Sequence, residues 1–444
     1  MTASTTAERD GLVLGVLLGN PSQNWRRRYP HDQTPRSDIQ HYVSEAQQAE
    51  AAKLHTVFLA DGVASSPQSV DLGLEPTTLL SALALQTERV GLIGSISTSF
   101  FEPFNVARQV ASLDHISSGR AGWNLVTSAG GGPNFGKGDA THDTRYEIAA
   151  EFAGVVDALW ESWDSDAVVA DRERNLLIDP ERVRTIDWKS KHFSVQGPLD
   201  IGRSPQGKPV LAQAGSSDLG KNLGAARADL VFTTGLIDVA ESVAFERDFA
   251  QRVQRAGRNR SEVKLIPGVA PVIGSTDEEA KRLWHEAYAD LDFEQARRQL
   301  ASQFDGRGFE DLGLDDAVPV DSLPPESAVE GRRSRYGVLL RLLQRGELRT
   351  VRDLVLYHAS AAGHWFPIGS VERIADQLQE RFERGAADGF NFLPFYNNYA
   401  HGLSAITEHL VPELQRRGLF QTEYAHATLR ENLGLTIPTS GGAR

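Results

Sequence analysis

The polar residues best placed for chemistry follow short apolar runs of the sequence. In the stretch QAGSSDLGKN, Gly215 allows a tight turn, and Ser216 and Ser217 stand where a helix through Lys221 would begin. Their hydroxyl groups, the free backbone N–H groups and the positive end of that helix would together form a phosphate site. The same two serines also fit an ordinary helix N-cap, which needs no ligand. The sequence leaves both interpretations open.

Mostly neutral hydrogen-bonding groups stand at the ends of the other apolar runs. They are Asp61, Ser97, Thr98, Asn124, Thr127, Ser128 and Gln213. A metal-dependent hydrolase would place His and Asp at such positions, and the chain has no His-x-His pair. Hydrolysis of a sugar would need a second carboxylate beside Asp61. We therefore expect no metal ion, and the set favours a polar, planar organic cofactor that brings its own chemistry.

Two histidines are candidates for moving protons or orienting a substrate. His142 stands just before a predicted helix, and Tyr146 of the same motif, THDTRYEIAAEF, could bond a phosphate. His364 lies between a glycine and an aromatic pair that begins with Trp365, at the end of a long irregular segment. His142 also fits an exposed helix start, and a lone histidine such as His364 can be purely structural. Both interpretations of each histidine remain open.

Four large aromatic residues could line a substrate pocket. Phe100 and Phe101 of SFFEPF follow the third apolar run, where they would form apolar walls or pack in the core. Trp25 of NWRRRYP follows the first run together with three arginines, one of which could meet an anionic substrate. Trp365 beside His364 completes the predicted pocket.

The elements that must position these residues are short apolar runs that alternate with amphipathic stretches. Stretches such as 38–53 and 146–163 fit helices, and the alternation predicts parallel strands with crossover helices. Eight such units indicate a (β/α)8 TIM barrel, whose C-terminal strand ends carry the site. A doubly wound sheet is the alternative, but LLGNPSQNW is not the glycine-rich turn that it would need. The predicted strands are 12–18, 55–61, 90–97, 121–128, 209–215, 230–235, 263–273 and 389–394.

Two long segments and a tail interrupt this repeat within a single predicted barrel domain, 1–444. Segment 164–208 follows the fourth strand and segment 292–370 follows the seventh. We expect both to build over the C-terminal face, where strand–helix loops form the site. The tail, 418–444, is too apolar in its first part for plain disorder, so we expect it to wrap another surface of the protein.

The composition of the 444 residues excludes several classes of function. The absence of cysteine excludes disulfides, thiolate metal sites and cysteine nucleophiles. The net charge of −13 and the scattered Lys and Arg argue against a nucleic-acid partner. The N-terminus is polar, and none of the apolar runs approaches the length of a membrane span. We therefore expect a cytoplasmic protein.

Taken together, several motifs resemble those of a known family. The stretches GRAGWNLVTS, HDTRY, SPQGKPVLAQAGSS, GAADGFNFLP and VPELQRRGLF are similar to the two-component flavin monooxygenases of the bacterial-luciferase superfamily. The branch is that of nitrilotriacetate, EDTA, dibenzothiophene-sulfone and long-chain alkane monooxygenases. The resemblance implies a barrel that binds reduced FMN from a separate NAD(P)H-dependent flavin reductase and uses O2 to oxygenate a small molecule. It also implies a homodimer or homotetramer.

The resemblance assigns roles to the candidate residues. FMN is expected to be held by Asp61, Ser97, Ser128, His142, Gln213 and Gly215, by Tyr146, Ser216 and Ser217 near the phosphate, and by Asn124 and Thr98 beneath the isoalloxazine ring. His364 and His142 are then the candidates for proton handling, and Asn124 and Thr98 for positioning flavin and oxygen.

One motif departs from the family pattern and bears on the substrate. Relatives often read TTTYNEP after the third strand, whereas this chain reads STSFFEP. The two phenylalanines make the mouth more apolar and weaken the case for a polycarboxylate substrate. Two other functions remain: a deazaflavin-dependent reductase or dehydrogenase of the same fold, and a barrel that binds a ligand without turnover.

Overall fold

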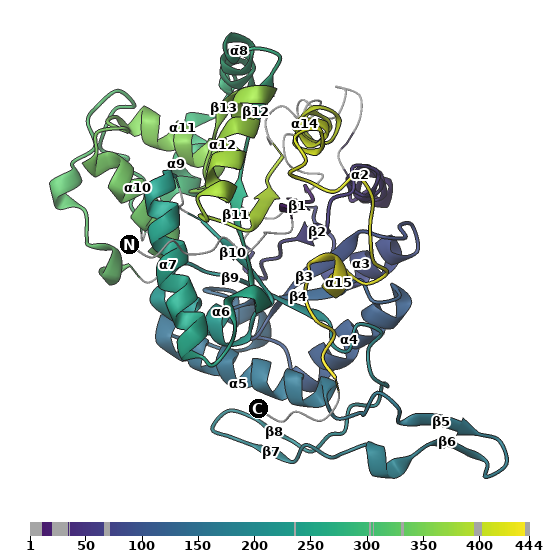
Figure 1. Ribbon diagram of the computed structural model, residues 1–444. Helices are drawn as coiled ribbons and strands as arrows, with labels where there is room; N and C mark the ends of the chain where they lie inside the picture. Colours follow the sequence, from purple (N-terminus) through teal and green to yellow (C-terminus); the bar gives the residue numbers. More distant parts are fainter. Residues whose placement is uncertain are drawn as a thin grey trace, which may run out of the picture.

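The computed structural model describes residues 11–19, 34, 36–65, 72–234, 237–301, 303–304, 306–329, 333–394 and 402–439. Eight parallel strands among these residues close into a barrel in the order β1-β14-β11-β10-β9-β4-β3-β2. Figure 1 shows the strands at the centre with helices around them. The predicted (β/α)8 barrel is confirmed, and the doubly wound alternative is wrong. The strands are β1 Val13–Leu17, β2 Thr56–Leu59, β3 Gly91–Ser97, β4 Ala121–Val126, β9 Val210–Ala214, β10 Leu230–Thr233, β11 Lys264–Val269 and β14 Gly389–Phe392.

Successive residues of each strand face alternately the barrel interior and the surrounding helices. On β3, Ile93 packs inside the barrel, whereas its neighbour Leu92 packs on the helix side. On β4, Trp123 faces the helix α5 (His142–Trp160). The next residue, Asn124, therefore faces the interior, where it donates a hydrogen bond to Ser95 of β3. This alternation decides which polar side chains reach the interior.

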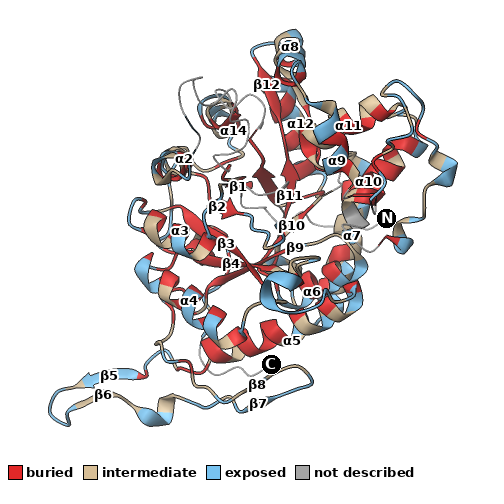
Figure 2. Ribbon diagram, turned by 180° about the vertical axis from the view of Figure 1, so that it is seen from behind, coloured by how far each residue is buried: buried red, intermediate tan, exposed pale blue. Residues whose placement is uncertain are grey.

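Helices cover the outside of the barrel, and Figure 2 shows that each turns a buried face toward the strands. Side-chain caps begin several of them: Asp38, Thr141 and Ser217 each accept a hydrogen bond from a backbone N–H of the first turn. No helix in the described part of the chain is long and apolar enough to cross a membrane. The helices are α2 Ile39–Ala51, α3 Pro76–Ala84, α4 Pro103–Ile116, α6 Asp218–Arg227, α7 Val239–Arg255, α12 Val371–Glu383, and α13 Gly402–Ser404 with α14 Val411–Arg416 around a π-helix, Ala405–Leu410.

The first insertion, 164–208, lies at the N-terminal end of the barrel. It forms two hairpins, β5–β6 (Val168–Asp171, Leu176–Ile178) and β7–β8 (Trp188–Lys189, Ser194–Val195). Figure 1 shows both hairpins below the barrel, on the side away from α8. The expectation that this insertion builds over the C-terminal face is therefore wrong. Helix α5 has already returned the chain to the N-terminal face before the insertion begins.

The second insertion follows β11 directly and therefore builds at the C-terminal end of the barrel, as predicted. It begins earlier than the predicted residue 292, because the predicted strand 263–273 is two strands, β11 and β12. Its strands β12 and β13 pair in a separate parallel sheet, and its helices enclose a small core around Leu300, Tyr336 and Leu354. The elements are β12 Val272–Gly274, α8 Asp277–Tyr288, α9 Phe293–Ala301, α10 Arg333–Gln344, α11 Val351–Ala361 and β13 Ile368–Ser370.

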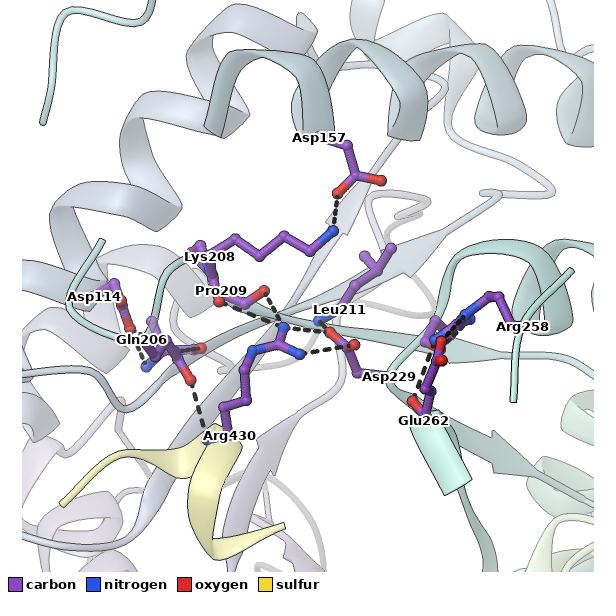
Figure 3. Close-up of polar contacts among 12 residues, drawn as sticks. Asp114, Asp157, Gln206, Lys208, Pro209, Leu211, Asp229, Arg258, Glu262 and Arg430 are labelled. Atoms are coloured by element: carbon purple, nitrogen blue, oxygen red, sulfur yellow. Dashed lines mark hydrogen bonds and ion pairs between the residues drawn. The ribbon is translucent and has the colours of Figure 1, made fainter. Parts of the chain in front are cut away.

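The tail closes the N-terminal end of the barrel. Leu429 of α15 (Leu429–Asn432) packs against the interior residues Val13 and Ile93. Figure 3 shows that Arg430 of the same helix reaches Asp229 at the start of β10, at 2.7 Å between Nη2 and Oδ2. Apolar side chains thus fill one end of the barrel, and the C-terminal end is the one that can take a ligand.

Candidate active site

Residues predicted to bind phosphate converge where β9 turns into α6. The hydroxyl of Tyr146, on α5, lies close to two glycines of this turn. A Cβ atom built on Gly215 would be 3.3 Å from the hydroxyl oxygen, and one built on Gly220 would be 3.1 Å from it. The absence of both side chains thus brings the hydroxyl directly over the backbone of the turn. We name Tyr146, Gly215, Ser216 and Ser217 the α6 cluster. It combines a phenol, two hydroxyls and the positive end of a helix, which together suit an anion.

The two serines of the α6 cluster are held differently. Ser217 is the N-cap of α6, because its Oγ accepts a hydrogen bond from the N–H of Gly220 at 3.2 Å. Ser216 Oγ lies 3.4 Å from the hydroxyl of Thr234, which is a longer contact. The ordinary N-cap interpretation therefore describes Ser217. The hydroxyl of Ser216 contributes less to the fold, so it is the more available of the two for a ligand.

His142 is buried beside the α6 cluster. Its ring lies 4.8 Å from the ring of Tyr146, and its Nδ1 is 3.1 Å from a carboxylate oxygen of Asp143. Thr141 caps the helix just before it, which fixes the position of this first turn. His142 is therefore not the exposed helix-start residue that one interpretation predicted. It stands at the start of α5, next to the α6 cluster.

The ends of β3 and β4 carry a second group of polar side chains. Asn124 Nδ2 donates to Ser95 Oγ at 2.8 Å, and Ser128 Oγ donates to Ser97 Oγ at 2.9 Å. Thr98 Oγ1 donates to a backbone carbonyl of β4. The amide oxygen of Asn124 is buried and has no hydrogen-bond partner within the described residues. An unpaired buried acceptor costs about 1–3 kcal/mol, so this oxygen fits a donor on a bound ligand.

His364 is enclosed above β11 with only 1% of its surface exposed. Its ring lies 5.3 Å from that of Phe232, and a Cβ atom on Gly268 would collide with Nδ1. Within the described residues, Nδ1 has no hydrogen-bond partner. Burial, helped by the positive charge of Arg335, lowers the pKa of His364 well below its usual value. The imidazole is therefore neutral at pH 7, with an unused nitrogen inside the mouth.

Aromatic side chains form an apolar surface on the loops after β3 and β4. The rings of Phe100 and Phe135 stack at 4.7 Å, with 4° between their planes. Phe101 lies 6.4 Å from the same partner. Phe135 ends a 3-10 helix, Gly132–Phe135, that the glycine cluster after β4 makes possible. Sequence reasoning missed Phe135, although its place two residues after a proline in the next strand–helix loop is a usable signal.

Several predicted residues are not brought into the interior. Gln213 faces outward from β9 toward α6, because its neighbours on the strand face inward. Trp365 also packs outward, with its ring 6.3 Å from that of Phe390. The extended chain turns His364 inward and so the next side chain outward. Asp61 is exposed in the loop after β2, and Trp25 lies outside the described residues.

One interior residue was not predicted. Asn391 of β14 is fully buried, and neither its amide nitrogen nor its amide oxygen has a hydrogen-bond partner within the described residues. A Cβ atom on Gly15 of β1 would lie 2.9 Å from its Oδ1. The sequence signal is an amide flanked by Phe390 and Phe392, which both face the helices.

One group of described residues has the spacing of metal ligands, and it lies outside the mouth. Ligand atoms of Glu147, Glu151 and His192 lie within 4.8 Å of one another on the outer side of α5. Glu147 already pairs with Lys191 of the first insertion at 2.7 Å. These side chains tie the β7–β8 hairpin to α5, and they do not belong to the site at the barrel mouth.

Comparisons with known proteins agree with this geometry. The luciferase-like monooxygenase family matches residues 15–388. The chain is 36% identical to N-acetyl-S-(2-succino)cysteine monooxygenase of Bacillus subtilis, over 99% of this chain and 100% of that protein. It is 39% identical to nitrilotriacetate monooxygenase component A of Aminobacter aminovorans, over 97% and 96%. The solved structure of a riboflavin lyase with modified FMN and riboflavin superposes with a TM-score of 0.81 at 29% identity, over 97% of each chain.

The match to the family spans most of the barrel, and both curated relatives cover nearly the whole chain. The resemblance inferred from the sequence motifs is thereby confirmed. The chain belongs to the luciferase-like monooxygenase family and is a flavin-dependent monooxygenase.

Proposed function

We propose that this enzyme uses reduced FMN, delivered by a separate NAD(P)H-dependent flavin reductase, and O2 to oxygenate a small organic molecule. The α6 cluster carries this proposal, because a phenol and a helix start meet over two glycines at the barrel mouth. The relative named component A of nitrilotriacetate monooxygenase supports a system with a second component. The riboflavin lyase supports FMN as the form of the flavin.

The residues present fit FMN at both ends of the molecule. Tyr146 and Ser216 would hold the phosphate together with the first turn of α6. Asn124, with its unpaired amide oxygen, would accept a hydrogen bond from an N–H at the polar edge of the flavin ring. Ser97 and Ser128 stand beside it on the same wall. When bound, reduced FMN supplies the electrons that activate O2.

The chain contributes orientation, proton handling and protection from water. Ser95 fixes the amide of Asn124 and so the position of the flavin edge. The neutral imidazole of His364 can accept a proton from the substrate at its unprotonated ring nitrogen and, once protonated, can return that proton to the oxygenated product. The second insertion and the apolar, stacked rings of Phe100 and Phe135 would limit the access of water to a substrate bound in the mouth. Exclusion of water favours transfer of oxygen to the substrate over release of hydrogen peroxide.

The names of the relatives indicate which small molecules to test first as substrates. N-acetyl-S-(2-succino)cysteine and nitrilotriacetate both carry carboxylates, whereas the aromatic surface of this mouth favours apolar parts of a substrate. A panel should therefore contain these two compounds together with sulfones, chlorinated aromatics and alkanes. We also propose a homodimer or homotetramer, which sedimentation would test.

The test is a coupled assay of purified enzyme, FMN, NADH and a flavin reductase. Product formed in the presence of O2 from one member of the panel supports the proposed function. Turnover with a reduced deazaflavin and without O2 would favour the reductase of the same fold. Tight binding of a panel compound with no product under either condition would favour a ligand-binding barrel.

A further inference from the structure

Asn391 is an unusual residue to keep inside a barrel. Its side chain is fully buried on β14, and neither atom of its amide has a partner within the described residues. Leaving a buried polar group unpaired destabilises a fold, and native structures contain few such groups. Hydrophobic residues occupy the neighbouring positions of the same strand. The fold by itself therefore gives no reason for an amide here, and a ligand would.

The surroundings of Asn391 form a polar wall. Its strand lies between β1 and β11, and the residues in register with it, Gly15 and Gly268, both lack side chains. A Cβ atom on Gly15 would collide with the hydroxyl of Thr56, and one on Gly268 would collide with Nδ1 of His364. The two glycines thus let the Thr56 hydroxyl and the His364 imidazole reach inward on either side of the amide.

This wall faces the one assigned to the flavin. In the closed order of eight strands, β14 and β4 are four places apart, so Asn391 and Asn124 stand on opposite sides of the barrel. The α6 cluster lies on the side of β4 and β9. A flavin held there leaves the side of β11 and β14 for the second reactant.

We propose that Asn391 and His364 form the substrate wall of the pocket and hold an oxygen-bearing group of the substrate between the amide and the imidazole. The inference rests on the proposed function, because it assigns one wall to FMN. An amide N–H donates to a carboxylate, carbonyl or sulfonyl oxygen, and a neutral imidazole can donate as well. Asn391 is then a positioning residue, since it orients the substrate and transfers no proton.

A cationic side chain lies close to this wall. Arg335 of α10 packs beside Gly363, where a Cβ atom would lie 3.4 Å from its Cγ, and its charge contributes to the low pKa of the adjacent His364. The stacked phenylalanines across the mouth would then take the apolar part of the same substrate.

Thermal unfolding of variants, measured without substrate, shows whether the amide of Asn391 serves the fold or is kept for a ligand. Gln206 is the matched control, because it is also a fully buried carboxamide, but it bonds Asp114, Ala121 and Arg430. Gln206→Leu should lower Tm by several degrees, since it leaves those partners unpaired. Asn391→Leu should leave Tm unchanged or raise it. A loss as large as that of the control would overturn the inference.

Binding and coupling then test what the amide holds. Asn391→Leu should keep the affinity of the enzyme for reduced FMN. Asn391→Ala, a smaller variant for the case that leucine does not fit, should keep it as well. Both should raise KM about tenfold for the panel compound that the wild type oxygenates, and release more hydrogen peroxide per NADH. Weakened flavin binding would place the amide on the flavin instead, and unchanged KM and coupling would make it irrelevant to substrate. Either result overturns the inference alone, whereas a wild type that fails to bind reduced FMN overturns the proposed function as well.

Discussion

At the scale of single residues, the polar groups of the mouth differ in whether the fold already satisfies them. The hydroxyl of Ser217 caps α6, and that of Ser97 accepts a hydrogen bond from Ser128. Oδ1 of Asn124 and Nδ1 of His364 are buried and have no partner within the described residues. Buried polar groups are almost always paired in native proteins, so an unpaired one inside the mouth is a candidate contact for a ligand.

The two serines of the α6 cluster should separate binding from stability. Ser216→Ala should weaken FMN binding by about 1–2 kcal/mol through one lost hydrogen bond, with little change in stability. Ser217→Ala should lower the free energy of unfolding by about 1 kcal/mol, because it removes the N-cap. The double variant should stay folded. Flavin titrations and denaturant unfolding of the three variants measure both quantities. Unchanged FMN affinity in a folded double variant would show that the serines of QAGSS only cap the helix.

His364→Ala should preserve folding and flavin affinity but lose product. A group that moves a proton in the reaction contributes about 10²–10⁴ in rate, so reduced flavin should instead yield hydrogen peroxide. Because the folded pKa of His364 lies below its unfolded value, its effect on stability is absent above the unfolded pKa and destabilising as the pH falls below it. Coupled product per NADH is the measurement. A fully coupled variant at the parent rate would make His364 structural and leave His142 as the candidate.

At the scale of elements, the connections decide which face each segment reaches. Helix α5 returns the chain to the N-terminal face, so the hairpins of the first insertion end up far from the mouth. The second insertion leaves β11 without a helix in between, and its segment before β13 brings His364 inward. Leu429 of α15, together with Leu433 and Leu435 directly after it, closes the opposite end. The proposed active site and the tail that closes the barrel therefore lie at opposite ends.

Helix α15 should be sensitive to the loss of its one buried cation. Burial alone would raise the pKa of Asp229, but Arg430 and Lys208 hold it below its usual value. Arg430→Ala should therefore destabilise the fold by about 3–5 kcal/mol, because it leaves Asp229 buried and unpaired. Combining it with Asp229→Asn should recover part of the loss. Urea unfolding of the single variants and the double variant measures these free energies. If the loss in the double variant equals the sum of the losses in the single variants, the ion pair contributes nothing.

Asp114, at the end of α4 beside α15, should make stability depend on pH. Burial raises its pKa to about 6, although hydrogen bonds from Ala121 and Gln206 oppose the shift. A carboxyl group with a raised folded pKa contributes stability below its unfolded pKa and loses it as the pH rises toward the folded pKa. Relative to Asp114→Asn, the wild type should therefore lose roughly 1–3 kcal/mol between pH 4 and about 6. Parallel pH profiles of the two proteins would contradict this.

At the scale of the whole molecule, the α6 cluster proposed to hold the phosphate of FMN consists of hydroxyls and a helix end. Lys221 on α6 already pairs with Asp248 at 2.7 Å and with Asp218 at 3.0 Å, so it is committed to the fold. Neutral hydrogen-bond donors bind a phosphate less strongly than charged Lys or Arg side chains do. Such a site would suit the exchangeable flavin of the proposed two-component system.

The purified protein should consequently carry little flavin and bind reduced FMN more tightly than oxidised FMN. Lys221 is engaged by Asp248 and is not free to bind the phosphate, so we expect the ring end of the site to contribute much of the affinity. Anaerobic titrations with FMN in both redox states measure the difference. Stoichiometric, tightly held oxidised FMN on isolation would contradict the proposal of a separate flavin reductase.

The sequence by itself determined the barrel, the family and some of the local structure at its mouth. Eight apolar runs have the length and composition of strands buried on both faces. Seven have bounds within two residues of a barrel strand, whereas the run 263–273 joins β11 to β12 of the second insertion. The glycine and two serines after β9 also predict a helix start, since turn and capping preferences are local. The family follows from motifs along the whole chain.

Only the tertiary structure decided which side chains share the interior. Alternation along a strand turns Gln213 and Trp365 outward while it turns Asn391 and His364 inward, and an error of one residue in a predicted strand reverses such an assignment. The pairing of Phe100 with Phe135, and of Tyr146 with Gly215, joins segments from different strand–helix units. Such contacts depend on the closure of the sheet, which no local pattern specifies.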